Sequence, residues 1–553
     1  MRYVAIACST ILLFTACITA RAEDSKAEAR APRIVNIVNF IRLLEPRSEA
    51  ITEDVLYETV VKQTELMKQH KLPGTFLLQY DALMESRYQQ LLEGLPDEQF
   101  EIGAWWELPQ PLVEKAGLEW RGRFPWDWHA DVGFASGYTP EQREKLVDVY
   151  MADFKKAFGY YPKSVASWFI DAHTLQYMRD RYGIVASANC KDQVGTDGYT
   201  LWGGYWNQAY YPSKVNAYMP AQTESQQIPV PVFRMLGSDP LRQYDNGIGH
   251  THQGVISLEP VYGDSGGDAA WVDWFLENFV DGECLAFNYT QAGQENSFTW
   301  DGMHRGLEYQ FPLIAQLRDE GKVRVETLHE SGEWFRRNFE TTPATSMTYQ
   351  SPLRDDTRQT VWFNSRFYRT SLIWQDRHLR IRDIHLFDES VESPILKQKI
   401  TSPAVEFYAQ PVVDGFHWSS REVLAGIVFK ARIDGQDVEL TGGEPEVTSP
   451  QPGELRILWP LTNVEGALVI ELAERTMHIA LEGLSADWWA EFRAAPDADL
   501  PFTRVQAKSL DCSFQSHDYR VNATEGSFTQ TDGGFRITPD GGAITLRPAI
   551  GGE

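Results

Sequence analysis

The sequence predicts an α/β fold, a (β/α)7-type barrel followed by a C-terminal all-β domain that resembles a sandwich, and two observations carry this prediction. From residue 34 to residue 335, short apolar runs alternate with segments of helical period, which is typical of parallel β/α units. After about residue 342, short alternating runs are separated by Gly, Pro and Asp, which is typical of antiparallel β-structure. We therefore expect a barrel domain at residues 32–342 and a sandwich domain at residues 343–553.

The apolar runs give the barrel strands in order. We expect strands at residues 34–40, 75–79, 100–106, 165–170, 184–189, 230–235, 284–289 and 323–326. Helices are expected at residues 53–70, 139–158, 269–278 and 303–320, with another running through Tyr182. The clearest helix has its N-cap at Thr139, Gln142 to complete a capping box, and Gly159 at its end. Seven or eight such units favour a barrel over an open sheet.

The second half of the chain and one connection in the barrel half lack the alternation of apolar runs and helical segments. Antiparallel strands are expected at residues 360–364, 370–374, 379–384, 423–429, 454–459 and 467–471. The connection at residues 191–228 has no helical period and is rich in Gly, Tyr and Trp; loops of this length in compact domains are usually functional. Two aromatic groups in Gly-containing loops predict a lined cleft: Trp105, Trp106, Trp120, Trp126 and Trp128, and Tyr199, Trp202, Tyr205, Trp206, Tyr210 and Tyr211.

The N-terminus has the features of a secretory signal. Arg2 is followed by a mostly apolar stretch at residues 4–19 and by the small-x-small sequence that ends at Ala22. We expect cleavage of residues 1–22 and export to the periplasm or the extracellular space. The alternative is a lipoprotein anchored through Cys17, since residues 14–17 loosely resemble a lipobox. No later segment has the roughly 18 apolar residues that a membrane span needs.

The net charge and the cysteine content exclude some classes of binding partner and of site. A net charge of −26 argues against nucleic acid, whose phosphates require a basic surface. Cys190, Cys284 and Cys512 form neither a disulfide framework nor a zinc pattern. We expect a carbohydrate partner, no membrane span and no nucleic acid. The sequence leaves the oligomeric state open.

Four acids follow apolar runs in the barrel half: Asp81, Glu107, Asp171 and Glu295. Cleavage of a glycosidic bond needs two carboxyl groups, and a barrel rim can bring acids from distant strands within ~5 to 10 Å. The alternative for each is a helix N-cap or a salt-bridged rim residue. Asp171 and Glu107 are the strongest candidates, because each follows an apolar run that contains tryptophan.

Histidine pairs and one basic strand end are further candidates. His250 and His252 form an H-x-H pattern, and His129 with Asp131 could supply further metal ligands. Hydrogen bonding is the alternative for such pairs. Arg234 and Asp239 could hold substrate or form a salt bridge at the rim. The sequence contains no Gly-rich phosphate loop.

Several of these segments resemble the glycoside hydrolase/deacetylase barrel superfamily, which includes family 38 α-mannosidases, family 57 amylases and NodB-like deacetylases. PGTFLLQ is similar to its second strand, FEIGAWWE to its third, and SWFIDAHTLQYM to the W-x-I-D segment that carries the family 38 nucleophile. The resemblance covers residues 32–339 and implies that Asp171 is that nucleophile. NFIRLLEPR and YTQAGQENSFTW also resemble an exported bacterial family of unassigned function.

The sequence departs from the metal-binding members of this superfamily. The paired Asp that follows the first strand of the deacetylases is replaced by Arg42 and Glu45, and there is no later H-x-x-x-H. The family 38 zinc motif and the family 57 H-Q-P opening are missing as well. We therefore expect no cofactor. A divalent metal at His250 and His252 is the alternative.

The leading hypothesis is an exported glycoside hydrolase that acts on a poly- or oligosaccharide. Its catalytic candidates are Asp171 as nucleophile and Glu295, then Glu107, as general acid/base. The residues expected to bind substrate are Arg42, Tyr80, Asp81, Trp105, Trp106, Trp126, His129, His173, Arg234 and Asp239. Two alternatives stay open: a metal-dependent polysaccharide deacetylase or esterase on the same fold, and a non-catalytic glycan-binding protein.

Overall fold

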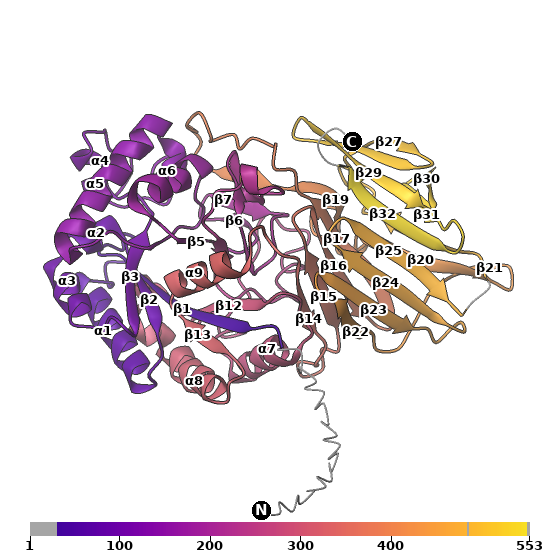
Figure 1. Ribbon diagram of the computed structural model, residues 1–553, viewed down its shortest axis with the longest axis horizontal. Helices are drawn as coiled ribbons and strands as arrows, with labels where there is room; N and C mark the ends of the chain where they lie inside the picture. The colour runs from indigo at the N-terminus through magenta and orange to yellow at the C-terminus, as the bar shows by residue number, and fades with distance from the viewer. Residues whose placement is uncertain (1–29, 484–485, 550–553) are drawn as a thin grey trace, which may run out of the picture.

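The computed structural model describes residues 30–483 and 486–549 (Figure 1). The expected signal sequence and Cys17 lie outside this range. The indigo-to-pink half in Figure 1 is a barrel with helices around it, and the brown-to-yellow half is a stack of β-sheets. Within the described part of the chain, no helix combines the length and hydropathy needed to cross a membrane.

Seven parallel strands form a nearly closed barrel in the order β12-β1-β2-β3-β4-β5-β11. They are β1 (Arg33–Ile41), β2 (Gly74–Leu78), β3 (Phe100–Trp105), β4 (Ser164–Ala166), β5 (Ala186–Asn189), β11 (Val232–Arg234) and β12 (Asn288–Ala292). β13 (Arg324–Glu326) also pairs with β1, and β8 (Ala209–Tyr210) pairs antiparallel with β11. Gln208 spans the gap to β12, because its amide donates to Asn288 Oδ1 and accepts from Tyr289 N, each at 2.8 Å.

Helices surround the barrel. They are α1 (Glu53–Gln69), α2 (Tyr80–Leu83), α3 (Ser86–Glu93), α4 (Gln110–Lys115), α5 (Pro140–Phe158), α6 (Ala172–Tyr182), α7 (Ala269–Asp281), α8 (Thr299–Asp319) and α9 (Leu328–Asn338). The capping box of α5 is confirmed: Thr139 accepts from Gln142 N, Gln142 bonds back, and Gly159 ends the helix in the left-handed conformation. The apolar faces of these helices pack on strands whose side chains are almost entirely buried.

Two expected strands have different bounds. The run at 165–170 is a strand only up to Ala166, the end of β4, and Ile170 N bonds to the side chain of Asn189 instead of to a strand backbone. The run at 284–289 becomes β12 four residues later than expected. Leu285 N bonds instead to the Ser346 hydroxyl in the second half of the chain. Both apolar runs are buried, but only part of each joins the barrel ladder.

The connection between β5 and β11 is a compact part of the core. It forms β6 (Gln193–Thr196), β7 (Tyr199–Trp202), β8, β9 (Pro212–Ser213) and β10 (Asn216–Pro220). The prediction that its aromatic residues line an open cleft is wrong, because all six are at most 3% exposed. Trp206 stacks on Trp362 of the second half with ring centroids 3.9 Å apart. β7 also pairs with β18 (Val405–Tyr408), which joins the two halves.

The second half is built on two large antiparallel sheets. The first holds β14 (Thr345–Tyr349), β15 (Gln359–Asn364), β16 (Tyr368–Gln375), β17 (His378–Leu386), β19 (Gln410–Asp414), β20 (Gly426–Ile433), β21 (Gln436–Glu439), β26 (Trp488–Arg493), β30 (Ser527–Thr531) and β31 (Gly534–Thr538). The second holds β22 (Glu446–Gln451), β23 (Glu454–Pro460), β24 (Ala467–Ala473), β25 (Thr476–Glu482), β27 (Phe502–Gln506), β28 (Ser509–Phe514), β29 (His517–Glu525) and β32 (Ala543–Ala549). A shared apolar core of alternating side chains lies between them.

Candidate functional site

The mouth of the barrel, at the C-terminal ends of its strands, holds three charged side chains in direct contact. Arg42 directly follows β1, Glu107 follows β3 and Glu295 follows β12. Arg42 Nη2 lies 3.1 Å from Glu107 Oε2 and 2.9 Å from Glu295 Oε2. Because both oxygens contact one nitrogen, they are separated by at most about 6 Å, close to the spacing of paired catalytic carboxylates. Two predicted acids thus meet here.

Indole groups fix the Glu107 carboxylate. Trp105 Nε1 donates to Oε2 and Trp168 Nε1 donates to Oε1, both at 2.8 Å. Only 1% of Glu107 is exposed. Burial raises the pKa of Glu107 above its usual range, and the charge of Glu295 adds to this, while Arg42 and the indoles act in the opposite direction. Such a carboxyl group keeps its proton to higher pH than a free carboxyl group does.

Arg42 is the centre of the cluster. Its guanidinium carbon lies 4.1 Å from the centroid of the Trp126 ring, a cation–π contact. Burial disfavours the charged form, but Glu295 and Glu107 more than compensate, and the pKa of Arg42 is above its ordinary value. Arg47 lies at the edge, paired with Glu45 and 3.9 Å from Glu295. The Ser297 hydroxyl donates to Glu295 Oε1.

Glu259 and Lys191 are buried near this cluster and did not emerge from the sequence. Glu259 accepts from Ser257 Oγ at 2.8 Å and from Gln294 Nε2 at 3.1 Å. Burial raises the pKa of Glu259 and lowers that of Lys191, and the charge of each favours ionisation of the other. Lys191 comes two residues after β5. The strand-end criterion that selected acids would have found this lysine, whereas Glu259 lies in a stretch without periodicity.

Asp81 also lies at the mouth, while its neighbour Tyr80 points elsewhere. The Asp81 carboxylate accepts from Ala82 N at 2.7 Å, and burial raises its pKa to about 6. Backbone hydrogen bonds from Leu43 and Leu44, the two residues after Arg42, lower that pKa in part, as does the charge of Arg42. Tyr80 instead donates to Asp153 of α5 at 2.6 Å. Of these two predicted substrate contacts, the structure brings only Asp81 to the charged group.

Asp171 is the N-cap of α6. Its Oδ1 accepts from Thr174 N at 2.9 Å and its Oδ2 from Thr174 Oγ1 at 2.6 Å. The buried Arg143 of α5 forms an ion pair with it at 3.1 Å. These contacts account for both carboxylate oxygens and match the capping alternative that the sequence left open. The structure brings Asp171 into no contact with Glu107 or Glu295, and its catalytic role stays a prediction.

The predicted tryptophans have two kinds of environment. Trp105 stacks on Phe40 with centroids 4.0 Å apart and holds Glu107, and Trp126 covers Arg42. Trp106 packs edge-on against Tyr150 in the helical layer and faces away from the cluster. Trp168, which the sequence did not single out as a site residue, is half-buried beside Glu107. Its place in the apolar run before Asp171 was the available signal.

The remaining predicted site residues have structural partners. Arg234 forms a buried ion pair with Asp192 at 2.7 Å. Asp239 pairs with Arg242 at 2.8 Å and accepts from Trp271. His129 lies 3.9 Å from Asp127, and His173 bonds to Glu144 at 3.1 Å across α5 and α6. His250 contacts Arg421 at 2.8 Å, and His252 is exposed near Thr251.

Across residues 30–483 and 486–549, no three His, Cys, Asp or Glu side chains converge as a metal site.

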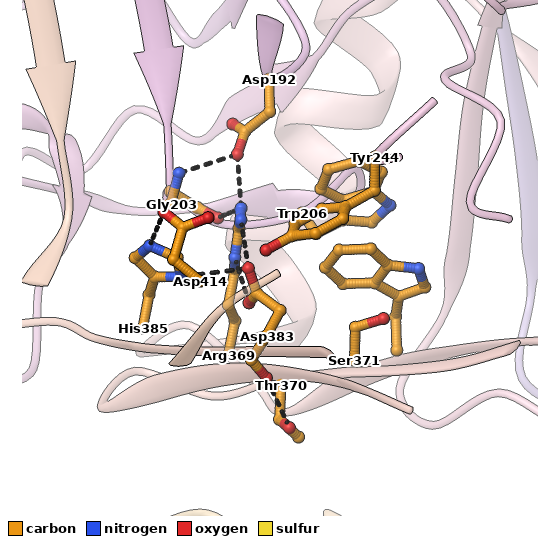
Figure 2. A network of polar contacts seen from close by, with 12 residues as sticks. Asp192, Gly203, Trp206, Tyr244, Arg369, Thr370, Ser371, Asp383, His385 and Asp414 are labelled. Carbon is orange, nitrogen blue, oxygen red and sulfur yellow. Dashed lines mark hydrogen bonds and ion pairs between the residues drawn. The ribbon is translucent and has the colours of Figure 1, made fainter. Parts of the chain in front are cut away.

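A buried ionic network connects the barrel to the first sheet of the second half (Figure 2). Asp192 accepts from Gly203 N at 2.9 Å and from Arg369. It also forms the ion pair with Arg234. Arg369 in turn holds Asp383 through two bonds of 2.9 Å. His385 lies 3.1 Å from Asp383 and 3.6 Å from Asp414. Asp192 directly follows Lys191, so the network begins at the barrel mouth.

Sequence comparisons with known proteins give one match, to a family model. A family model described as a domain of unknown function with a solved structure, DUF3863, matches residues 130–349, less than half of the chain. This segment contains Glu259 and Glu295 but neither Arg42 nor Glu107. No curated protein matches the chain.

Among solved structures, a candidate glycoside hydrolase/deacetylase from Parabacteroides distasonis has a TM-score of 0.53 at 16% identity, covering 69% of this chain and 91% of that one. A candidate polysaccharide deacetylase from Mycobacterium smegmatis has a TM-score of 0.35 at 12% identity, covering 56% of this chain and 91% of that one. Only the first comparison bears on the fold. The chain is therefore similar in fold to a glycoside hydrolase/deacetylase protein, as the sequence resemblance predicted.

Proposed function

We propose that the protein is an exported glycoside hydrolase in which Glu107 and Glu295 form the catalytic pair. The observation that carries the proposal is the contact of both carboxylates with one guanidinium nitrogen of Arg42 at the C-terminal mouth of the barrel. In a β/α barrel this end is where catalytic residues gather. The fold shared with the Parabacteroides protein agrees with a carbohydrate substrate.

The two carboxyl groups have different environments, which assigns their roles. Glu107, with its raised pKa, is the general acid that protonates the leaving oxygen. Glu295, held by Arg42 and Ser297, is the nucleophile that attacks the anomeric carbon. Glu107, once deprotonated, then activates the water that releases the sugar. Arg42 keeps the two oxygens in place and offsets the charge on the pair.

The short separation favours retention of configuration. Retaining enzymes hold their carboxyl groups ≈ 5–5.5 Å apart, whereas inverting enzymes leave ≈ 6.5–9.5 Å for a water molecule. The upper limit of about 6 Å set by Arg42 agrees with the first class. Proton NMR of the first sugar released would therefore detect the anomer of the substrate, and detection of the opposite anomer would rule out a glycosyl-enzyme intermediate.

Variants at the pair test the proposal. On aryl glycosides, we expect Glu107→Gln and Glu295→Gln to lower kcat by at least about 10²-fold, the scale of acid–base catalysis. The loss in Glu107→Gln should shrink when the leaving group is dinitrophenol, which needs no protonation. Glu101→Gln is the matched control, because Glu101 is buried on the same strand but bonds to Thr75 and His329 at its other end. Full activity in both pair variants would refute the assignment.

The pH profile gives a second test of the same roles. Because burial raises the pKa of Glu107, the protonated acid persists to higher pH than in a free carboxyl group. Activity should therefore fall as pH rises through that pKa, and the fall should be absent from the residual activity of Glu107→Gln. Measurement of kcat/KM from pH 4 to pH 9 separates the two enzymes. An unchanged basic limb in the variant would assign the acid elsewhere.

Export and metal independence are parts of the proposal that need their own measurements. We propose that residues 1–22 are removed and that the mature protein begins at Glu23, which intact mass determination of the secreted protein tests. For the metal-dependent alternative, elemental analysis of the purified protein and activity after chelation are the decisive measurements. A stoichiometric ion whose removal abolishes activity would favour the deacetylase or esterase hypothesis.

A further inference from the structure

Large apolar side chains that are more than one-third exposed are few in the described chain, and two of them flank the barrel mouth. The set is Val55, Met84, Phe124, Tyr160, Phe298 and Tyr309. Phe124 is 38% exposed and lies in the connection after β3, while Phe298 is 36% exposed and lies three residues after Glu295. Single exposed apolar residues are common on protein surfaces and need no explanation. An exposed aromatic ring close to the proposed catalytic pair is a better candidate for a binding role.

The first ring belongs to an aromatic path that starts at Arg42. Arg42 contacts the Trp126 ring, Trp126 lies 5.9 Å from Trp128, and Trp128 stacks on Phe124 at 6.1 Å with an interplanar angle of 18°. We call Phe124 and Trp128 the loop pair. These contacts lead from the buried carboxylates to the surface, where Arg123 covers Trp128 and the exposed Phe124 ring can stack on the C–H face of a sugar.

The loop that holds this pair is well fixed. Arg123 forms two hydrogen bonds with the buried Asp127 carboxylate, at 2.9 and 2.7 Å, and packs over the Trp128 ring. Trp120 Nε1 donates to Phe124 O at 3.0 Å. The hydrogen bonds from Arg123 lower the pKa of Asp127 to about 2 despite its burial, so the Arg123 contact persists across the neutral range. The rings are therefore presented without a large ordering cost on binding.

The second ring has a partner on the other side of the mouth. Phe298 meets Tyr262 edge-on with centroids 6.4 Å apart. We call Tyr262 and Phe298 the Tyr262 pair. Tyr262 N donates to Glu259 O at 3.4 Å, so this residue lies beside the turn that holds Glu259. β12, which precedes Phe298, and β3, which precedes Phe124, are separated in the sheet by β1 and β2. The two pairs thus flank Arg42.

We propose that the loop pair and the Tyr262 pair are subsites for sugar rings on opposite sides of the carboxylate pair, so that the substrate is a glycan chain bound along its length. This inference rests on the proposed function. A single terminal sugar would need only the site at Glu107 and Glu295. Ring platforms on both sides instead match a chain that enters on one side of the scissile bond and leaves on the other.

Binding without catalysis tests the subsites. The method is native affinity electrophoresis of the Glu295→Gln protein. The ligands are the polymers in the gel: laminarin, xylan, hydroxyethyl cellulose or glycol chitin. At least one polymer should retard this protein. Phe124→Ala and Phe298→Ala, each in the Glu295→Gln background, should weaken retardation about 5- to 10-fold, the scale of a lost aromatic contact. Tyr160→Ala is the control, since Tyr160 is exposed but precedes β4 at the opposite end of the barrel.

The outcomes separate the subsites from the proposed chemistry. Retardation that depends on Phe124 and Phe298, together with no hydrolysis by wild-type protein, would support the subsites and refute the hydrolase. Hydrolysis with equal retardation of all variants would support the hydrolase and overturn the subsites. Absence of retardation in every gel would also overturn them. In active protein, the subsite variants should raise KM for the polymer about tenfold and change kcat/KM for an aryl monosaccharide less than about twofold.

Discussion

At the scale of the residue, Arg42 explains how two buried carboxylates share one small volume. Each ion loses hydration on burial, and two like charges would force a proton onto one of them. One guanidinium nitrogen in contact with both carboxylates reduces the repulsion and fixes their spacing. The Trp126 ring covers the guanidinium and limits competition from water. A single side chain thereby creates the geometry that pairs Glu107 with Glu295.

Replacement of Asp171 tests whether this residue is a catalytic acid or only the N-cap of α6. Asn is also a good N-cap, so Asp171→Asn should preserve α6 and the fold. It removes the charge opposite the buried Arg143, which we expect to cost about 3 kcal/mol of unfolding free energy. Urea denaturation measures this loss, and kcat on the best substrate should remain within a few-fold of wild type. A loss of 10²-fold or more in a folded variant would restore Asp171 to the active site.

The strand-end criterion identified part of this site for a physical reason. Parallel strands end at one rim, so residues that follow different strands, such as Arg42, Glu107 and Glu295, can meet there. The criterion does not distinguish Asp171 from them, because an acid directly before a helix is also favoured as its N-cap. Lys191 was missed although it follows β5 by two residues. Pairing within the rim depends on strand order, which no local pattern contains.

At the scale of the element, local signals predicted α5 but not the connection between β5 and β11. The capping box and the terminal glycine act within a few residues, so the bounds of α5 could be read from the sequence. The aromatic residues at 199–211 are fixed by partners far along the chain. Trp206 contacts Trp362, and Trp202 Nε1 donates to Asp414 at 2.9 Å. An aromatic-rich loop has the same sequence pattern whether it lines a cleft or is buried by residues far along the chain. The sequence therefore could not distinguish the two.

Trp206→Ala tests whether this connection is structural. The side chain is 1% exposed and stacked on Trp362, so truncation should cost about 3–5 kcal/mol through lost packing and a cavity. Thermal unfolding of the full chain measures the loss. Trp120→Ala is the control, since Trp120 is only half-buried and should cost less. Wild-type stability in Trp206→Ala, combined with a raised KM, would return this residue to the substrate cleft.

At the scale of the whole molecule, the two halves are joined by buried charge as well as by apolar packing. The barrel contributes Asp192 and Arg234, and the first sheet of the second half contributes Arg369, Asp383, His385 and Asp414. Every ion in the network has a partner of opposite sign, as burial requires. The fold class and the change of texture near residue 342 were predictable, because they depend on periodicity. This network was not, because its members come from distant strands.

His385 makes the stability of this junction depend on pH. It faces Asp383 on β17, Asp414 on β19 and Arg369 on β16. Burial and Arg369 lower the pKa of His385, but the two carboxylates outweigh them and hold it above its usual value. Stability from the charged imidazole is therefore complete below the unfolded pKa of about 6.5 and is lost as pH rises through the folded pKa.

Replacement of this histidine should remove that dependence. We expect the unfolding free energy of wild-type protein to fall between about pH 6.5 and pH 9 by a larger amount than that of His385→Asn, measured by urea denaturation at constant ionic strength. At pH 6 the variant should be less stable by about 2–4 kcal/mol, because Asp383 and Asp414 lose a buried cation. His517→Asn is the control, as this imidazole lies near the surface of β29. Parallel pH curves for wild type and His385→Asn would place the titrating group outside the junction.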